Sequence, residues 1–130
     1  MGRIRQVTIR YLIDTSILLW DLMDDPRLNA THSELLLGDD PKFVSIATLW
    51  EIAIKVAVGK LRMPQRLLQT LRESDVQLLD ISPEHALHCA AMPLHHGDPF
   101  DRMLIAQAQL EKMTVLTSDR HFALYDVLLA

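Results

Sequence analysis

Short apolar runs alternate with segments of helical periodicity along the chain. Buried strands are predicted at 7–13 (VTIRYLI), 42–46 (KFVSI), 76–81 (VQLLDI) and 114–118 (TVLTS), with a last short strand at 126–129 (DVLL). Strands that alternate with helices usually pair in parallel and carry the helices on the faces of the sheet. The pattern therefore predicts an α/β domain with a mainly parallel central sheet and helices on both faces.

Helices are predicted from capping residues and apolar spacing. The best defined one spans 98–112, with Asp98 as N-cap and Pro99 as the first helical residue. A helix from 47 is expected to end at Gly59, a residue type suited to helix ends. Further helices are predicted at 16–23, 28–37, 64–74 and 83–92, and a helical turn at 119–125.

Composition narrows the class of protein. The 130 residues, 49% of them hydrophobic, suit a single domain over 1–130, with residues 1–6 as an extension before the first strand. The formal charge of −4 argues against a wholly basic nucleic-acid-binding surface and leaves room for local basic patches. Cys89 is the single cysteine, which excludes an internal disulfide and favours a reducing, cytoplasmic setting. No stretch predicts a membrane span.

Acidic residues lie at or near the C-terminal ends of the predicted strands. Asp14 follows the first strand and Asp119 the fourth, while Glu51 and Asp101 lie in the first turns of predicted helices. Ligand sites of parallel sheets collect beyond the carboxyl ends of the strands, so these acids are expected to share one edge. Carboxylates gathered there would repel one another, and a hard cation such as Mg²⁺ would relieve that repulsion.

Each acid also has an ordinary structural explanation. Asp14, Asp98 and Asp119 occupy positions suited to helix N-caps. Glu51 can form an ion pair with Lys55, one helical turn further on. Spacing alone therefore leaves open both a metal site and a set of caps and surface pairs.

Three segments together resemble the PIN-domain ribonucleases of the VapC toxin type. They are YLIDTSILLW (11–20), SIATLWEIAIK (45–55), and DPFDRMLIAQAQ (98–109) followed by VLTSDRHF (115–122). The resemblance covers nearly the whole chain from about residue 7. It implies a PIN-like three-layer sandwich and a metal-dependent endoribonuclease that hydrolyses RNA phosphodiester bonds, as the toxin of a type II toxin–antitoxin pair.

The resemblance also implies a set of site residues and partners. The acids expected to bind Mg²⁺ or Mn²⁺ and to carry catalysis are Asp14, Glu51, Asp101 and Asp119. The residues expected to support them are Thr15, Ser16, Asp98, Thr117 and Ser118. Turn and cap chemistry explains these small polar residues equally well. The implied partners are RNA, a small antitoxin protein laid across the acidic groove, and a second copy of the chain in a homodimer.

Basic residues cluster in one part of this acidic chain. The stretch from Ile52 to Arg72 holds five bases and no acid, and RNA affinity depends on phosphate contacts. The residues predicted to contact RNA are Lys55, Lys60, Arg62, Arg102 and Arg120. A solvated face, or a docking surface for an acidic partner, is the alternative.

Apolar residues of the first two helices, including Trp20, Met23 and the run 35–37, predict either a dimer or antitoxin surface or ordinary core packing. Trp50 is expected in the core. His95 and His96 precede the helix at 98, and they are assigned to loop positions because no complete zinc ligand set accompanies them.

Other classes of protein also place an aspartate after the first strand. A haloacid-dehalogenase-type phosphatase needs a second acid at position 16, where this chain has serine, and the pattern of a phosphotransfer receiver is also incomplete. A catalytically inactive PIN-like binding or regulatory module remains the alternative to a nuclease.

Overall fold

A parallel sheet of five strands forms the centre of the protein in the computed structural model, which describes residues 8–130. The strands are β1 (Tyr11–Ile13), β2 (Lys42–Ser45), β3 (Gln77–Leu79), β4 (Thr114–Leu116) and β5 (Leu128–Leu129). Their order is β3-β2-β1-β4-β5, and every neighbouring pair is parallel. The predicted extension, 1–6, and the first residue of the predicted strand 7–13 lie outside the described residues.

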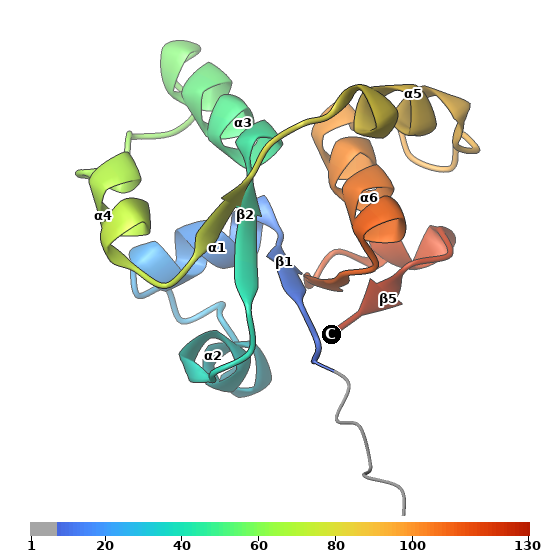
Figure 1. The fold of residues 1–130 in the computed structure, drawn as a ribbon. Coiled ribbons are helices and arrows are strands. Elements are labelled where there is room, and N and C mark those ends of the chain that lie inside the picture. The colour runs from blue at the N-terminus through green and yellow to red at the C-terminus, as the bar shows by residue number, and fades with distance from the viewer. Residues whose placement is uncertain (1–7) are drawn as a thin grey trace, which may run out of the picture.

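Helices cover both faces of this sheet (Figure 1). They are α1 (Thr15–Leu22), α2 (Ala30–Leu37), α3 (Ile46–Ala57), α4 (Leu67–Glu73), α5 (Pro83–Ala91), α6 (Pro99–Glu111) and the 3₁₀ helix η1 (Arg120–Leu124). Helices α1, α2 and α4 lie on one side of the sheet, and α5 and α6 on the other (Figure 1). The predicted α/β fold class, a three-layer sandwich with a parallel sheet, is confirmed.

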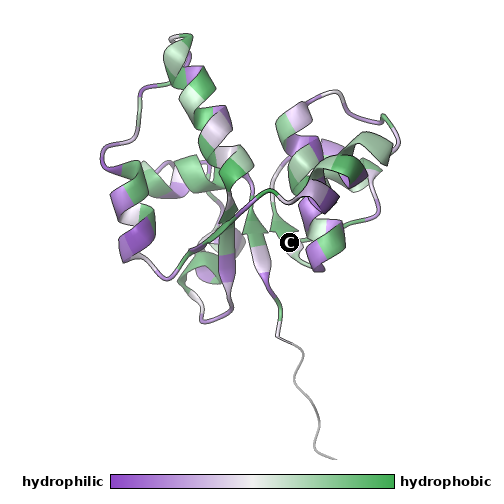
Figure 2. Ribbon diagram, turned by 45° about the horizontal axis from the view of Figure 1, so that its top comes forward, coloured by the Kyte–Doolittle hydropathy of each residue, from purple (hydrophilic) through white to green (hydrophobic). Residues whose placement is uncertain are grey.

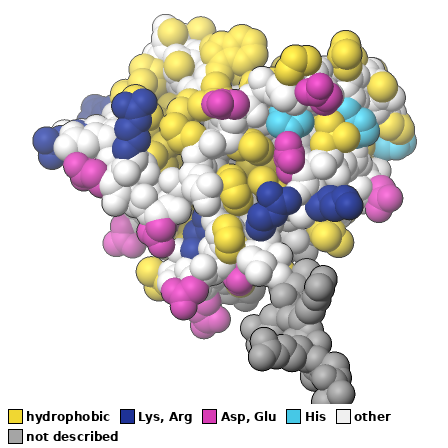
Figure 3. Space-filling view, in the orientation of Figure 1, with side chains coloured by type: hydrophobic (Ala, Val, Ile, Leu, Met, Phe, Trp, Pro, Cys, Tyr) yellow, Lys and Arg dark blue, Asp and Glu magenta, His cyan; other side chains and the backbone are white. Residues whose placement is uncertain are grey.

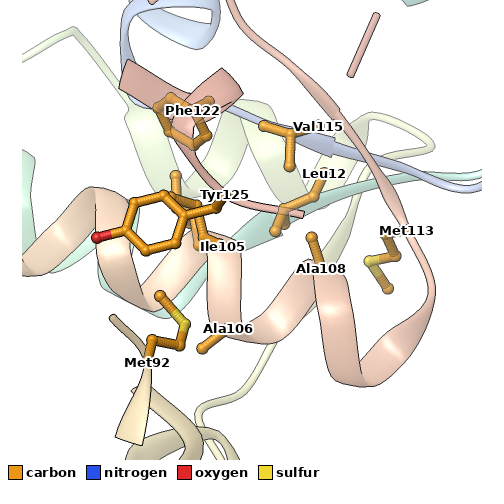
Figure 4. Close-up of a cluster of buried hydrophobic side chains, with 10 residues drawn as sticks. Leu12, Met92, Ile105, Ala106, Ala108, Met113, Val115, Phe122 and Tyr125 are labelled. Carbon is orange, nitrogen blue, oxygen red and sulfur yellow. The ribbon is translucent and has the colours of Figure 1, made fainter. Parts of the chain in front are cut away.

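The strands alternate between two hydrophobic clusters, one on each face of the sheet. Tyr11 and Ile13 of β1 belong to the cluster under α1, α3 and α4, whereas Leu12 points into the cluster under α6 and η1. Figure 2 shows where hydrophobic and hydrophilic residues lie along the elements. In the second cluster the ring of Tyr125 packs beside Ile105, and its hydroxyl points away from the apolar side chains (Figure 4).

Local backbone chemistry explains where α3 ends. Gly59 has φ +77°, and its N–H donates to the Val56 carbonyl at 3.1 Å while the Lys60 N–H donates to the Lys55 carbonyl at 2.8 Å. This pair of bonds is the Schellman arrangement, in which a left-handed residue closes the last turn. The role predicted for Gly59 is therefore confirmed.

Two local predictions were wrong. The helix predicted from Pro64 begins at Leu67, because Arg66 adopts the left-handed conformation (φ 54°) and interrupts the helix there. Trp50, expected in the core, is 61% exposed and packs edge-on against Phe100, with ring centroids 5.3 Å apart.

The first two helices are mostly used for packing. Trp20, Leu35 and Leu36 pack against the hydrophobic cluster on their side of the sheet, while Met23 and Leu37 are exposed. Core packing thus accounts for most of the apolar residues that were predicted to form either a dimer or antitoxin surface or part of the core. Across residues 8–130, no helix combines the length and the hydrophobicity needed to cross a membrane.

Candidate metal centre

Asp14 lies directly beyond the end of β1, at the centre of the sheet. Its N–H donates to the Leu116 carbonyl of β4 at 3.0 Å, and its carbonyl accepts the Leu18 N–H that opens α1. The side chain is buried, with the residue 4% exposed, and it makes no capping bond to the helix. Its carboxylate instead accepts a hydrogen bond from Thr117 Oγ1 at 2.8 Å. The capping explanation therefore fails for the Asp14 side chain.

Glu51 is buried on α3, and both of its carboxylate oxygens have partners. Thr15 Oγ1 donates to Oε1 at 2.7 Å, and Lys55 Nζ lies 2.9 Å from Oε2. The ion pair between Glu51 and Lys55 that the sequence suggested is present. Glu51 itself is only 5% exposed, so it does not lie on a solvated face. Its hydrogen bond and charge raise the pKa of Lys55 above the usual value.

Asp101 lies in the first turn of α6, and Asp98 caps that helix. Asp98 Oδ1 accepts the Phe100 and Asp101 N–H groups at 2.9 and 3.0 Å, which confirms its predicted capping role. The Asp101 side chain is 13% exposed, and its Oδ2 lies 3.0 Å from His96 Nε2. Burial raises the pKa of Asp101 to about 6, although the His96 contact lowers it; repulsion from Asp98 and Glu51 adds to the rise.

Asp119 follows β4 and begins η1. Its Oδ1 accepts the His121 N–H at 2.9 Å and lies 2.8 Å from His121 Nδ1, while its own N–H donates to Thr117 Oγ1 at 3.0 Å. Its side chain is 37% exposed. Burial raises the pKa of Asp119, but the bonds from His121 outweigh that effect and hold the pKa below its usual value.

These acids lie close enough together to affect one another's pKa values. Burial raises the pKa of Asp14 to about 7; the Thr117 hydrogen bond lowers it, and the charges of Asp101 and Glu51 raise it further. Asp101 is in turn repelled by Glu51 and Asp119. The fold thus brings the acids named from the sequence to one edge of the sheet. The donors are carboxylate oxygens, and burial raises the pKa of Asp14 and Asp101, which fits a site for a hard divalent cation.

Side chains that could share one ion include two histidines that were not predicted as site residues. Among residues 8–130, two sets of three side chains place ligand atoms within 4.8 Å of one another: His96–Asp98–Asp101 and His96–Asp119–His121. Asp14 and Glu51 belong to neither set. They are linked to the other acids by electrostatic repulsion, since the charges of Asp101 and Glu51 raise the pKa of Asp14. The only sequence signal for His96 and His121 was their nearness to Asp98 and Asp119.

The predicted supporting residues divide into two kinds. Thr15 and Thr117 are buried and hydrogen-bonded to Glu51 and Asp14. Ser16 and Ser118 are exposed, and within the part of the chain that the structure describes no hydrogen bond links them to an acid of the site. Of these four residues, Thr15 and Thr117 are therefore the ones that orient carboxylates of the site.

Arg102 is buried, in contrast to the other predicted RNA contacts. Its guanidinium donates to the carbonyls of Cys89, Met92 and Pro93 and to the Tyr125 hydroxyl, at 2.9 to 3.3 Å. Arg102 connects the end of α5 to α6, and both of its terminal nitrogens are already hydrogen-bonded, so they cannot bind a phosphate. Its role is structural, and the predicted RNA contact is wrong.

The other basic residues that were predicted to contact RNA reach the solvent. Lys60, Arg62 and Arg120 are exposed, while Lys55 is engaged by Glu51. Figure 3 shows basic side chains at the side of the molecule that carries α4 and the loop before it.

The fold and the site together define a class: parallel α/β domains with an acidic centre suited to divalent cations at the carboxyl edge of the sheet. The chain matches the model of the PIN domain family over residues 11–128, and it belongs to that family. No curated protein matches the chain closely enough to count as a relative.

Solved structures share this fold. A chain of DNA-bound VapBC from Salmonella typhimurium superposes with a TM-score of 0.71 at 19% identity, covering 94% of this chain and 97% of that one. VapBC2 from Rickettsia felis, bound to a promoter DNA fragment, gives 0.70 at 18% identity, covering 94% and 98%. FitAcB from Neisseria gonorrhoeae gives 0.68 at 20% identity, covering 92% and 95%. The family match confirms the predicted PIN domain, and these structures confirm its fold.

Proposed function

We propose that this protein is a divalent-metal-dependent endoribonuclease and the toxin of a toxin–antitoxin pair, acting in a reducing cytoplasm. One observation carries the proposal: Asp14 is buried at the carboxyl edge of the sheet, and its hydrogen-bond partner, Thr117, is neutral. The nearby charges that act on it, Asp101 and Glu51, are negative. Burying a carboxylate among other carboxylates is costly unless a cation compensates. Membership in the PIN family supports the nuclease assignment.

The residues of the site divide the work of holding such a cation. Asp14 and Asp101 would bind Mg²⁺ or Mn²⁺ directly, Glu51 would act through water, and Asp119 would hold a second ion. When bound, the ion lowers the pKa of its water and offsets charge on the scissile phosphate. Burial raises the pKa of Asp14 and Asp101, so these side chains would release protons when the ion binds. The affinity for the ion would therefore depend on pH.

Neighbouring groups fix the orientation of these carboxylates. Thr15 and Lys55 each hold one oxygen of Glu51, so this side chain has little rotational freedom. Thr117 donates to Asp14 and accepts from the Asp119 backbone, so one hydroxyl connects the ends of β1 and β4. Such supporting contacts commonly alter metal affinity by about 10- to 100-fold.

RNA would approach over exposed cations outside the acidic centre. Lys60 and Arg62 follow α3, and Arg120 adjoins Asp119; all three are exposed. We propose these residues as phosphate contacts, with Lys55 reserved for Glu51. The VapBC and FitAcB complexes named above support a small antitoxin as partner. A homodimer is proposed alongside it.

The test is an RNase assay with the purified, antitoxin-free chain in Mg²⁺ or Mn²⁺. Asp14→Asn and Asp101→Asn are expected to abolish cleavage, while Asp39→Asn, a change at an exposed loop position, leaves it intact. Cleavage that survives both site changes would exclude this centre. A folded parent without cleavage would instead favour the inactive PIN-like binding module.

A further inference from the structure

Helix α3 presents apolar side chains to the solvent. Trp50, Ile54 and Val58 recur every four residues and are 61%, 38% and 61% exposed. Steps of four residues keep side chains on one face of a helix, so these three residues form a stripe, called here the α3 stripe. The C-terminal end of α3 extends away from the body of the molecule, and hydrophobic side chains gather over this part of the surface (Figures 1 and 3). An exposed apolar surface of this kind indicates contact with another protein.

The composition of the helix around the stripe argues against RNA as its ligand. The segment 52–59, IAIKVAVG, holds one charged residue, Lys55, whose Nζ is bound to Glu51 at 2.9 Å. Binding of a phosphate backbone depends on free cations. Ala53 and Ala57 are exposed beside the stripe. Such small side chains let the axis of a second helix approach closely, within the 8–10 Å that is usual for packed helices.

The two ends of the stripe differ in charge. Acidic residues surround the N-terminal end at Trp50, since Asp98 and Asp101 lie close enough to α3 to raise the pKa of Lys55. Lys60 and Arg62 follow the C-terminal end, and both are exposed. Eight helical residues at 1.5 Å each place Val58 roughly 12 Å along the axis from Trp50. The cations beyond Val58 are therefore remote from the acidic centre of their own chain.

We propose that two copies of the chain associate through their α3 stripes, packed antiparallel about a two-fold axis at Ile54. Antiparallel packing places the acidic end of each stripe against the basic end of the other. A parallel pair would instead oppose acids to acids and bases to bases. The stripe is thus complementary to itself in charge, which favours a second copy over an unrelated protein as its partner.

An apolar hollow beside Trp50 supplies space for a side chain of the second copy. Its volume is about 210 Å³, and its lining includes Trp50, Ile81, Phe100 and Met103. In the antiparallel pair, Val58 of the partner subunit approaches this end of the stripe. The exposed end of each α3 then packs where the other chain offers an apolar surface.

This arrangement also completes the proposed RNA-binding surface. Lys60 and Arg62 of the partner subunit would lie beside the acidic centre, whereas the chain's own copies of these residues point to the other end of α3. The carboxylates of one chain and the cations of the other would then contact the same RNA. This consequence rests on the proposed nuclease function, but the association of the two chains does not.

Analytical ultracentrifugation of the full chain, without RNA, tests the association. We expect a dimer, and Ile54→Asp should raise its Kd at least about a hundredfold because a two-fold interface buries the new charge twice. Leu37→Asp is the matched control, since Leu37 is 84% exposed on α2, and it should leave the dimer intact. Thermal melts confirm that each variant folds. A monomeric parent, or equal dissociation by the control, would overturn the proposal and leave the stripe to a different protein.

A symmetric cross-link tests the antiparallel register. Cys89 is the only cysteine, so Cys89→Ser gives a background free of thiols. In that background Ile54→Cys should form a disulfide-linked dimer on mild oxidation, because a residue on the two-fold axis meets its own copy. Leu37→Cys in the same background should remain unlinked on a non-reducing gel. A dimer that links no better through position 54 than through position 37 would contradict this interface.

Mixed dimers test whether the cations act across the interface. Asp14→Asn removes the centre and keeps the cations, while Lys60→Ala with Arg62→Ala does the reverse, so neither variant should cleave RNA well alone. After subunit exchange in an equal mixture, about half of the dimers are mixed and each holds one complete surface, so about a quarter of the parental RNase activity should return. No recovery would show that the cations do not act in this way. A parent without RNase activity would refute the nuclease, while sedimentation and the cross-link still decide the interface.

Discussion

Replacing Asp14 by asparagine tests the electrostatic reasoning without requiring activity. The change removes a charge from a position that is 4% exposed, and it keeps an oxygen that can accept from Thr117. Burial raises the pKa of Asp14 from 3.8 to about 7. The folded metal-free protein therefore holds a proton that the unfolded chain has already released. Its stability should fall as the pH rises from about 4 to about 7.

The size of the effect follows from the two pKa values. At about 1.4 kcal/mol per pH unit, the difference between 3.8 and about 7 is on the order of 4 kcal/mol of lost stability above neutrality. Asparagine avoids this loss, but burying its amide N–H groups costs about 1–3 kcal/mol at every pH. The variant should thus be less stable than the parent at pH 4. At pH 8 we expect it to be more stable by roughly 1–3 kcal/mol.

Urea unfolding in the presence of a chelator, from pH 4 to pH 8, measures this difference. Asp39→Asn is the matched control, because Asp39 lies on an exposed loop and its replacement should not change the pH dependence. Parallel stability curves for the parent and Asp14→Asn would refute the reasoning. Added Mn²⁺ should reverse the order at pH 8, because an ion that binds only the folded parent stabilises it by mass action.

Three further substitutions test the contacts around the centre. Thr117→Val removes the hydrogen-bond donor to Asp14, so the pKa of Asp14 should rise further, which carboxyl NMR titration measures. The variant should also lose about 1–2 kcal/mol of stability at pH 8 in urea unfolding. Arg102→Lys cannot reproduce the four bonds of the guanidinium and should cost about 2–4 kcal/mol; a loss no larger than that of an exposed Lys60→Ala would contradict the structural role. Gly59→Ala forces a side chain into φ +77° and should lower stability by about 1 kcal/mol; an unchanged melt would argue against the left-handed turn.

The parallel sheet and its acidic edge were predictable because their signals are local. Alternation of Tyr11, Leu12 and Ile13 between two clusters follows from the period of a strand. An acid directly after such a strand must lie at the carboxyl edge, as Asp14 does. Gly59 was equally predictable, since the left-handed turn that ends α3 favours glycine.

The remaining features depend on contacts between distant segments. Arg102 is buried because carbonyls at the end of α5 converge on it, which spacing within α6 does not reveal. His96 and His121 stack because Tyr125 fixes the loop before α6 against η1. Trp50 lies outward because Phe100 of another helix supplies its packing partner. Side-chain direction in loops and at helix contacts is set by tertiary structure.

Anomalous diffraction from crystals grown with saturating Mn²⁺ would show directly whether the carboxylates of Asp14 and Asp101 bind an ion. We expect a Mn²⁺ peak at the end of β1, within about 2.3 Å of oxygens from both Asp14 and Asp101. Crystals in which this position stays empty, or in which Mn²⁺ binds only at other surfaces, would contradict the account.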